Sequence, residues 1–137
     1  MSRSLIFLGL LVLSTAAGCG GTNQQPLTGI VTWQGRPIER GAINLFPKSN
    51  DGITVGSEIN EGKFSISKKS GPTPGKYRVE IIAFRKTKKT EFDVDQNKQI
   101  VVEEQYLPIQ FNQSSTLEAE ISSGKPNELN FELKAER

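Results

Sequence analysis

Residues 76–84 read KYRVEIIAF, and this stretch decides the class of fold. Large or apolar residues occupy every second position, namely Tyr77, Val79, Ile81 and Ala83. Because successive side chains of a β-strand point to opposite faces, this spacing predicts a strand with one face in a core. Ile82 and Phe84 add apolar side chains to the other face near the end of the stretch.

The same two-residue period recurs along most of the chain. Leu117, Ala119 and Ile121 alternate with polar residues, and so do Leu129, Phe131 and Leu133; shorter rows are Ile53, Val55 and Ile59, and Phe64 with Ile66. No stretch has the 3.6-residue period of a helix. We therefore expect about seven to nine strands, at residues 28–33, 41–47, 53–59, 63–67, 76–84, 91–94, 99–103, 115–122 and 128–134.

Turn-forming residues separate these expected strands. Gln34-Gly35 follows a strand that ends at Trp33, and Asn60-Glu61-Gly62 predicts a hairpin. Gly35 and Gly41 bracket an expected turn with positive φ angles, and residues 70–75 (SGPTPG) predict a rigid loop. Many short strands at close spacing favour a single β-sandwich, because no second domain or internal repeat is visible.

The composition excludes several classes of function. The chain has 137 residues with 17 basic and 15 acidic side chains, so it lacks the basic footprint expected of a nucleic-acid partner. It contains no histidine, which removes the commonest general base and transition-metal ligand. Its one cysteine cannot form an internal disulfide. We expect no enzyme activity, no cofactor and no metal site.

The N-terminus has the order of a secretory signal. Arg3 precedes Leu5 to Ala17, a run of thirteen residues without a charge. This run is shorter than the roughly 20 apolar residues that a membrane-spanning helix needs. A basic residue, an apolar run and small residues in that order predict a signal peptide at residues 1–18, which we expect to form a helix before the domain.

Ala16-Ala17-Gly18-Cys19 resembles the lipobox of bacterial lipoproteins, with alanine where most members have leucine. The resemblance implies cleavage between Gly18 and Cys19 and a lipid on the Cys19 thiol, so that the membrane is the partner. Residues 19–26 then form a flexible tether, and residues 27–137 form the domain. The alternative is a secreted protein with a spare cysteine. Gly20, by similarity with other lipoproteins, favours the outer membrane within the cell envelope.

The domain itself resembles carboxypeptidase-regulatory-like and transthyretin-like (prealbumin-like) domains. The matching segments, in order, are GIV at 29–31, GRPI at 35–38, GAINLFP at 41–47, KFSI at 63–66 and GPTPGKYRV at 71–79. LPIQFN at 107–112 and SSTL at 114–117 are similar to the close of small lipoproteins of planctomycete bacteria. The resemblance implies a seven-stranded Greek-key sandwich on a lipid anchor, and the family has no assigned activity.

Three groups of polar residues are candidates for chemistry. Ser70 with Lys68 or Lys69 could form a serine–lysine pair, but these residues lie in a polar loop. Asp93 and Asp95 could share a face and hold calcium, and Glu103-Glu104 form another acidic pair, but no complete calcium loop is present. We interpret all three groups as solvated surface.

Two further features bear on binding. Arg85-Lys86-Thr87-Lys88-Lys89 carries four positive charges, and we interpret it as a solvated loop between strands rather than a contact for anionic lipid or polysaccharide. Trp33 and Tyr106 could stack on a sugar, but a sugar platform needs two or three coplanar exposed rings, which spacing alone does not show, so we interpret both residues as core or rim packing. We expect a lipid-anchored, non-catalytic structural or binding domain; the alternative is an accessory module that binds a carbohydrate or a peptide.

Overall fold

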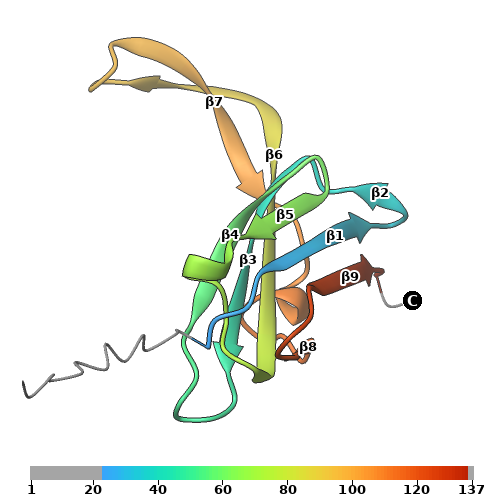
Figure 1. Ribbon diagram of the computed structural model, residues 1–137. Coiled ribbons are helices and arrows are strands. Elements are labelled where there is room, and N and C mark those ends of the chain that lie inside the picture. The colour runs from blue at the N-terminus through green and yellow to red at the C-terminus, as the bar shows by residue number, and fades with distance from the viewer. Residues whose placement is uncertain (1–22, 136–137) are drawn as a thin grey trace, which may run out of the picture.

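Strands make up almost all the regular structure in the computed structural model, which describes residues 23–135 (Figure 1). The strands are β1 (Leu27–Trp33), β2 (Arg36–Pro37), β3 (Arg40–Pro47), β4 (Val55–Asn60), β5 (Lys63–Ile66), β6 (Gly75–Asp93), β7 (Lys98–Gln105), β8 (Glu118–Ile121) and β9 (Asn127–Leu133). Over the same residues the helical segments are two 3₁₀ turns, η1 (Lys68–Ser70) and η2 (Ile109–Phe111). The expectation of an all-β fold is confirmed.

The nine strands belong to one open sheet that folds over on itself. Its order is β2-β1-β5-β4-β3-β6-β7, with β9 beside β1 and β8 beside β6. All pairs are antiparallel except β1 with β9, which run parallel. One residue pair, Asn60 with Lys63, joins β4 to β5. The sheet turns there, so that β1, β5 and β9 face β3, β4 and β6 as the two layers of a sandwich.

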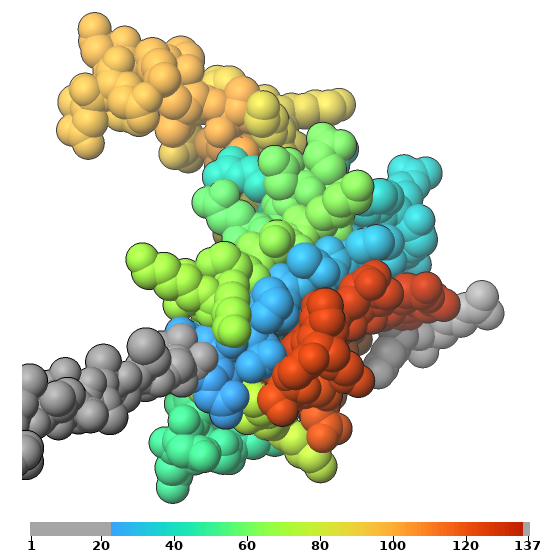
Figure 2. Space-filling model, viewed as in Figure 1, coloured from blue at the N-terminus to red at the C-terminus, as the bar shows by residue number. Residues whose placement is uncertain are grey.

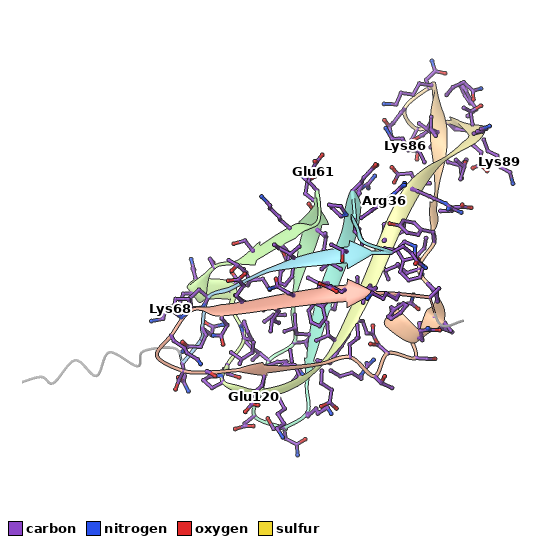
Figure 3. The ribbon with its side chains drawn as sticks, turned by 90° about the vertical axis from the view of Figure 1, so that its right-hand side faces the viewer. Arg36, Glu61, Lys68, Lys86, Lys89 and Glu120 are labelled. Atoms are coloured by element: carbon purple, nitrogen blue, oxygen red, sulfur yellow. The ribbon has the colours of Figure 1, made fainter. Side chains whose placement is uncertain are left out.

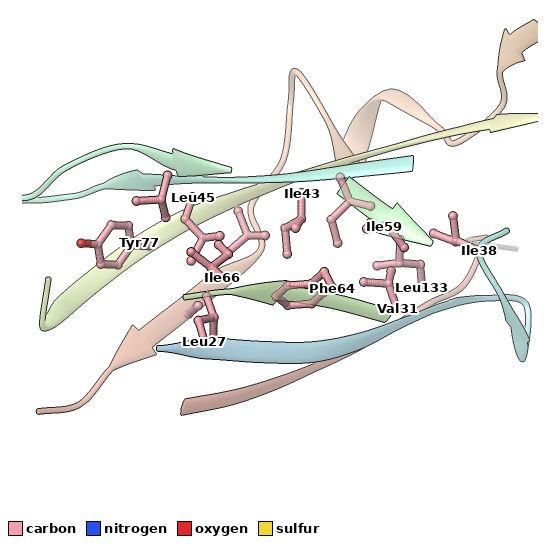
Figure 4. Packing of buried hydrophobic residues seen from close by; sticks show 14 of the residues in the cluster. Leu27, Val31, Ile38, Ile43, Leu45, Ile59, Phe64, Ile66, Tyr77 and Leu133 are labelled. Atoms are coloured by element: carbon pink, nitrogen blue, oxygen red, sulfur yellow. The ribbon is translucent and has the colours of Figure 1, made fainter. Parts of the chain in front are cut away.

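The core fills the space between these layers (Figure 4). Leu27, Val31, Phe64, Ile66 and Leu133 come from one layer, and Ile43, Leu45, Ile59 and Tyr77 come from the other. The row predicted in residues 76–84 is confirmed, because Tyr77, Val79, Ile81 and Ala83 are each at most 1% exposed. Ile53 is different: it was expected in an inward row, but it is 39% exposed and precedes β4.

A long hairpin projects from one end of the sandwich (Figures 1 and 2). The sequence predicted two strands, 76–84 and 91–94, with the basic run 85–89 as a loop between them. That prediction is wrong: β6 continues for 19 residues from Gly75 to Asp93. The basic run is extended because β7 pairs with it, with Arg85 opposite Glu104 and Lys86 opposite Glu103. We call residues 85–104 the arm.

Four smaller expectations are also corrected. Gly41 lies inside β3 with no positive φ, and glycine is needed because a Cβ there would lie 2.3 Å from the Ile82 carbonyl oxygen. The expected strand 115–122 begins only at Glu118. Ser70 belongs to the 3₁₀ turn η1. Arg36 and Pro37 form the short strand β2 within the expected turn. The hairpin at Glu61 and Gly62 is confirmed by φ angles of 53° and 77°.

The chain joins the sandwich at the end opposite the arm (Figure 1). Residues 19–26 were expected to be a flexible tether, but Gln25 is 9% exposed and its backbone N–H donates to the Pro72 carbonyl oxygen at 2.8 Å. A Cβ on Gly71 would lie 1.9 Å from the Gln25 carbonyl oxygen. The ordered domain therefore includes Gln25. The predicted signal peptide, Gly18 and Cys19 lie outside the described residues.

Candidate functional site: an aromatic groove at the base of the arm

A groove of about 520 Å³ lies where the arm leaves the sandwich. It is lined by three aromatic side chains, two arginines, one glutamate, one glutamine and one proline: Trp33, Phe84, Tyr106, Arg36, Arg85, Glu39, Gln34 and Pro37. These residues come from β1, β2, β6 and the connections beside them. We call this feature the aromatic groove.

Trp33 is fixed at one side of the groove by local structure and by packing. It is the last residue of β1 and lies opposite Arg36 across a two-residue turn, in which Gln34 and Gly35 have φ angles of 52° and 78°. Its ring meets the ring of Phe111 from η2 edge to face, with centroids 5.7 Å apart. Edge-to-face pairs of this kind are favourable beyond the area they bury. Trp33 is therefore half-buried and held in one orientation.

Tyr106 forms the other side of the groove. Its backbone N–H donates to the Ala83 carbonyl oxygen at 3.0 Å, which places it directly beside β6. The guanidinium of Arg85 lies over the ring, 5.4 Å from its centroid, and also binds Glu104 with an N–O distance of 2.7 Å. A cation over an aromatic face is attracted by the ring quadrupole. The Arg85 contact thus orders both side chains.

The surroundings of Tyr106 in the groove favour the neutral form of its hydroxyl by raising its pKa. Burial raises the pKa of Tyr106 above its ordinary value of 10.0, and the negative charge of Glu39 raises this pKa further. The positive charge of Arg85 opposes both effects. A neutral phenol offers one hydrogen-bond donor and one acceptor to a ligand.

This set of side chains suits binding better than bond breaking. Aromatic faces supply apolar contact area, and the two arginines and Glu39 supply donors and acceptors around them. Glu39 is the one carboxylate among the residues that line the groove, whereas glycoside hydrolysis ordinarily uses a pair. The residues that line the groove include no serine, threonine or cysteine that could act as a nucleophile.

A second groove, of about 550 Å³, lies over β1, β4 and β5 but has a different character. Its one aromatic side chain, Phe64, is 4% exposed and is part of the core. The remaining lining is mostly small or polar, as with Gly29 and Ser57. It therefore presents no stacking surface comparable to that of Trp33 and Tyr106.

The structure brings together two residues that the sequence named separately. Trp33 and Tyr106 were interpreted as core or rim packing, with a sugar platform as the alternative; both are partly buried against the core, and both line the aromatic groove. Arg36, Glu39 and Phe84 were not identified as groove residues, and Arg85 was assigned only to the basic run. No local pattern marks these positions, because their proximity depends on how β1, β2 and β6 are arranged in the sheet.

The serine–lysine candidate has no supporting geometry. Ser70, Lys68 and Lys69 are all exposed on η1. Over residues 23–135, no side-chain hydrogen bond joins the Ser70 hydroxyl to either lysine; the backbone N–H of Ser70 donates to the Ser67 carbonyl oxygen at 3.1 Å. The three residues therefore form part of the solvated surface, as expected.

The acidic candidates are occupied by contacts within the chain. Asp93 accepts hydrogen bonds from the backbone and the side chain of Gln96, at 3.0 and 2.8 Å, and so closes the turn of the arm. Asp95 lies in that turn, not on a strand beside Asp93. Glu103 binds Arg40, and Glu104 binds Arg85. In the part of the chain that the structure describes, no three acidic or cysteine side chains gather as metal ligands.

Comparison with models of known families, with curated proteins and with solved structures finds no match to this chain. The resemblances to a lipobox and to transthyretin-like domains therefore stay predictions that rest on the motifs quoted above. Between residues 23 and 135, no helix is long and apolar enough to cross a bilayer.

Proposed function

We propose that this chain is a lipid-anchored protein of the cell envelope whose β-sandwich domain binds a carbohydrate in the aromatic groove. The observation that carries the binding role is the position of Trp33 and Tyr106, which are far apart in the sequence and line one groove. The sequence motif ending at Cys19 supports the anchor.

The side chains of the groove match the surface of a sugar ring. Trp33, Phe84 and Tyr106 offer apolar area to the C–H faces of a pyranose, and Glu39 and the Tyr106 hydroxyl can bond its hydroxyl groups. Arg36 has no ion pair among residues 23–135, whereas Arg85 binds Glu104. Arg36 is thus the cation that can bind a carboxylate on the ligand. We therefore expect an acidic sugar, such as a uronic acid, to bind best.

The position of the groove fits an anchored receptor. The chain joins the domain beside the loop at residues 71–75, where β6 begins, and Phe84 lies nine residues further along β6. A strand rises about 3.3 Å per residue, so the groove lies roughly 30 Å from that end. With a lipid on Cys19, the domain would stand on its tether with the aromatic groove directed away from the bilayer.

A glycan array tests this proposal, with the full chain solubilised in mild detergent. We expect binding to glycans that contain acidic sugars, and we expect Tyr106→Ala to weaken it by roughly tenfold through the loss of stacking. Arg36→Gln should reduce the preference for acidic over neutral sugars.

Phe46→Ala is the matched control, because Phe46 also lies beneath an arginine but outside the groove; Arg78 lies 4.9 Å above its ring centroid. It should leave glycan binding unchanged. Binding at background level to every glycan, or an equal loss in the Phe46 and Tyr106 variants, would contradict the proposal. If the protein bound acidic peptides and no glycans, the groove would still be a binding site, but the proposal that its ligand is a carbohydrate would be wrong.

A further inference from the structure

The arm exposes apolar side chains that the sandwich does not cover. None of its residues is buried, and Phe92 and Val101 are 53% and 45% exposed. A two-stranded hairpin without a layer packed on it is marginally stable in water. The arm therefore has a stability deficit that a docked partner could offset.

The outer edge of β7 is the open side of this hairpin. In the described chain β7 pairs only with β6, so no strand covers its other edge. The sequence along that edge, residues 98–104, reads KQIVVEE, with a cation at one end, β-branched residues in the centre and two carboxylates at the other end. An exposed apolar edge of this kind is a template for pairing with another strand. Its charge order is complementary to itself when two copies run antiparallel.

The outer edge of β6 is protected against the same kind of pairing. Lys86, Lys88 and Lys89 lie along it, and lysines on an edge discourage strand addition. The β6–β7 register also shifts between Lys86 and Thr90, where the Thr87 hydroxyl donates to the Val102 carbonyl oxygen at 2.8 Å. Figure 3 shows Lys86 and Lys89 on the arm. Pairing of β7 with β6 of another copy, which would build an open chain of molecules, is therefore disfavoured.

We propose that two copies of this chain pair through their β7 edges, antiparallel and around a twofold axis at Val101. Residues that lie opposite each other in a sheet share a face, and a twofold axis perpendicular to the sheet puts the same face of both copies on the same side. Along one strand, residues on the same face have numbers that are all even or all odd. Two residues that lie opposite each other must therefore both be even or both be odd. Among such registers, the one centred on Val101 places Lys98 opposite the Glu104 carboxylate of the second copy, which Arg85 of that same copy also contacts.

This register also joins the apolar residues of the two arms. Ile100 lies opposite Val102 of the second copy, and Val101 lies opposite its own equivalent. Cross-strand pairs of β-branched residues and of opposite charges each stabilise a sheet. Phe92 lies on the same face as Val101, because Thr90 is opposite Val101 and Phe92 is two residues further along β6. The joined ribbon has four strands, with Val101 and Phe92 of both copies on one face and Ile100 and Val102 of both copies on the other.

The predicted association is weak in solution because seven residues of edge bury little area compared with a standard interface. Two copies held in one membrane would have a much higher effective concentration. The pairing itself does not depend on a lipid. A variant without Cys19 therefore tests the proposed dimer independently of the proposed lipid anchor.

Disulfide cross-linking tests the register in the full chain carrying Cys19→Ser, which removes the natural thiol. Val101→Cys places two thiols directly opposite each other, at the Cα separation of about 5 Å that a disulfide needs. Under mild copper-catalysed oxidation by air, we expect this variant to form a covalent dimer. Val94→Cys is the control, because Val94 is 79% exposed and lies at the tip of the arm.

A Val94 variant that cross-links as fast as the Val101 variant, or a Val101 variant that stays monomeric, would overturn the pairing. Sedimentation equilibrium gives an independent measurement. Val101→Lys should weaken dimerisation at least about tenfold, since it sets two like charges opposite each other. Ile109→Lys, at a 59% exposed position on η2, should leave it unchanged. A chain that is monomeric at every concentration, or one that forms unlimited polymers, would also contradict the proposed dimer.

Discussion

At the residue scale, Ser115 links two parts of the sandwich. It is 5% exposed, and its hydroxyl donates to the Val79 carbonyl oxygen at 2.5 Å while accepting from the Leu117 backbone N–H at 3.1 Å. The Val79 N–H in turn donates to the Leu117 carbonyl oxygen at 2.8 Å. These bonds attach the segment before β8 to β6. They give a physical reason for a serine at this position in the SSTL segment.

We predict that Ser115→Ala lowers the free energy of unfolding by about 1–3 kcal/mol, because it leaves buried backbone groups without their partner. The neighbouring Ser114 is exposed, so Ser114→Ala should change the same quantity by no more than about 0.5 kcal/mol. Urea unfolding of both variants measures the difference. Equal effects in the two variants would show that the Ser115 bonds do not stabilise the fold.

At the scale of elements, the arm is an addition to the sandwich and not part of its core. Every fully buried apolar side chain lies outside residues 85–104 in the part of the chain that the structure describes. Lys86 and Glu103 lie opposite each other, so the hairpin can be closed at that pair by a two-residue turn.

We predict that replacing residues 87–102 with Asn-Gly changes the free energy of unfolding by less than about 1 kcal/mol, because no core contact is lost. Ile81→Ala, in the part of β6 that lies within the sandwich, should lower it by about 2–5 kcal/mol. The shortened protein should also lose the proposed dimer and keep the aromatic groove. Collapse of the fold in the shortened protein would mean that the arm is required for stability.

The local signal explains why the sandwich strands could be predicted and the extended basic run of the arm could not, although the strand predicted at residues 99–103 is confirmed as part of β7. Tyr77, Val79 and Ile81 alternate because one face of β6 is buried, and a buried face leaves a period of two in the sequence. The run from Arg85 to Lys89 has no buried face, and its extended shape comes from pairing with β7, which is separate in the sequence. A segment whose conformation is set by pairing with another strand, and not by burial of one face, carries no local period of its own.

The candidate site shows the same limit. Trp33 and Tyr106 could be named as stacking residues from their chemistry, but β5, β4 and β3 lie between β1 and β6 in the sheet order, so their common location depends on the sheet folding over on itself. Gln25 was assigned to a tether because its neighbours are polar and aperiodic. Its backbone bonds to Pro72 and lies close to Gly71, and sequence composition does not reveal these contacts.

At the scale of the whole molecule, the proposed site of membrane attachment and the proposed binding surfaces lie toward opposite ends of β6. The chain joins the sandwich beside the loop that precedes β6, and the groove and the arm lie toward its other end (Figure 1). Figure 3 shows the same separation, with Lys68 near the N-terminal end of the domain and Arg36 near the base of the arm. In the proposed arrangement, the lipid holds one end at the membrane and leaves the ligand groove and the dimerisation edge accessible at the other.

Mass spectrometry of the N-terminus of the natural protein, purified from membranes, tests the proposed anchor most directly. We predict that the mature chain begins at Cys19 and that its sulfur carries a diacylglycerol group, which adds about 0.8 kcal/mol of membrane affinity for each buried methylene. Cys19→Ser should be released from the membrane fraction or should keep residues 1–18. A natural chain that begins elsewhere, or a Cys19 with a free thiol in a protein that fractionates without membranes, would contradict the anchor.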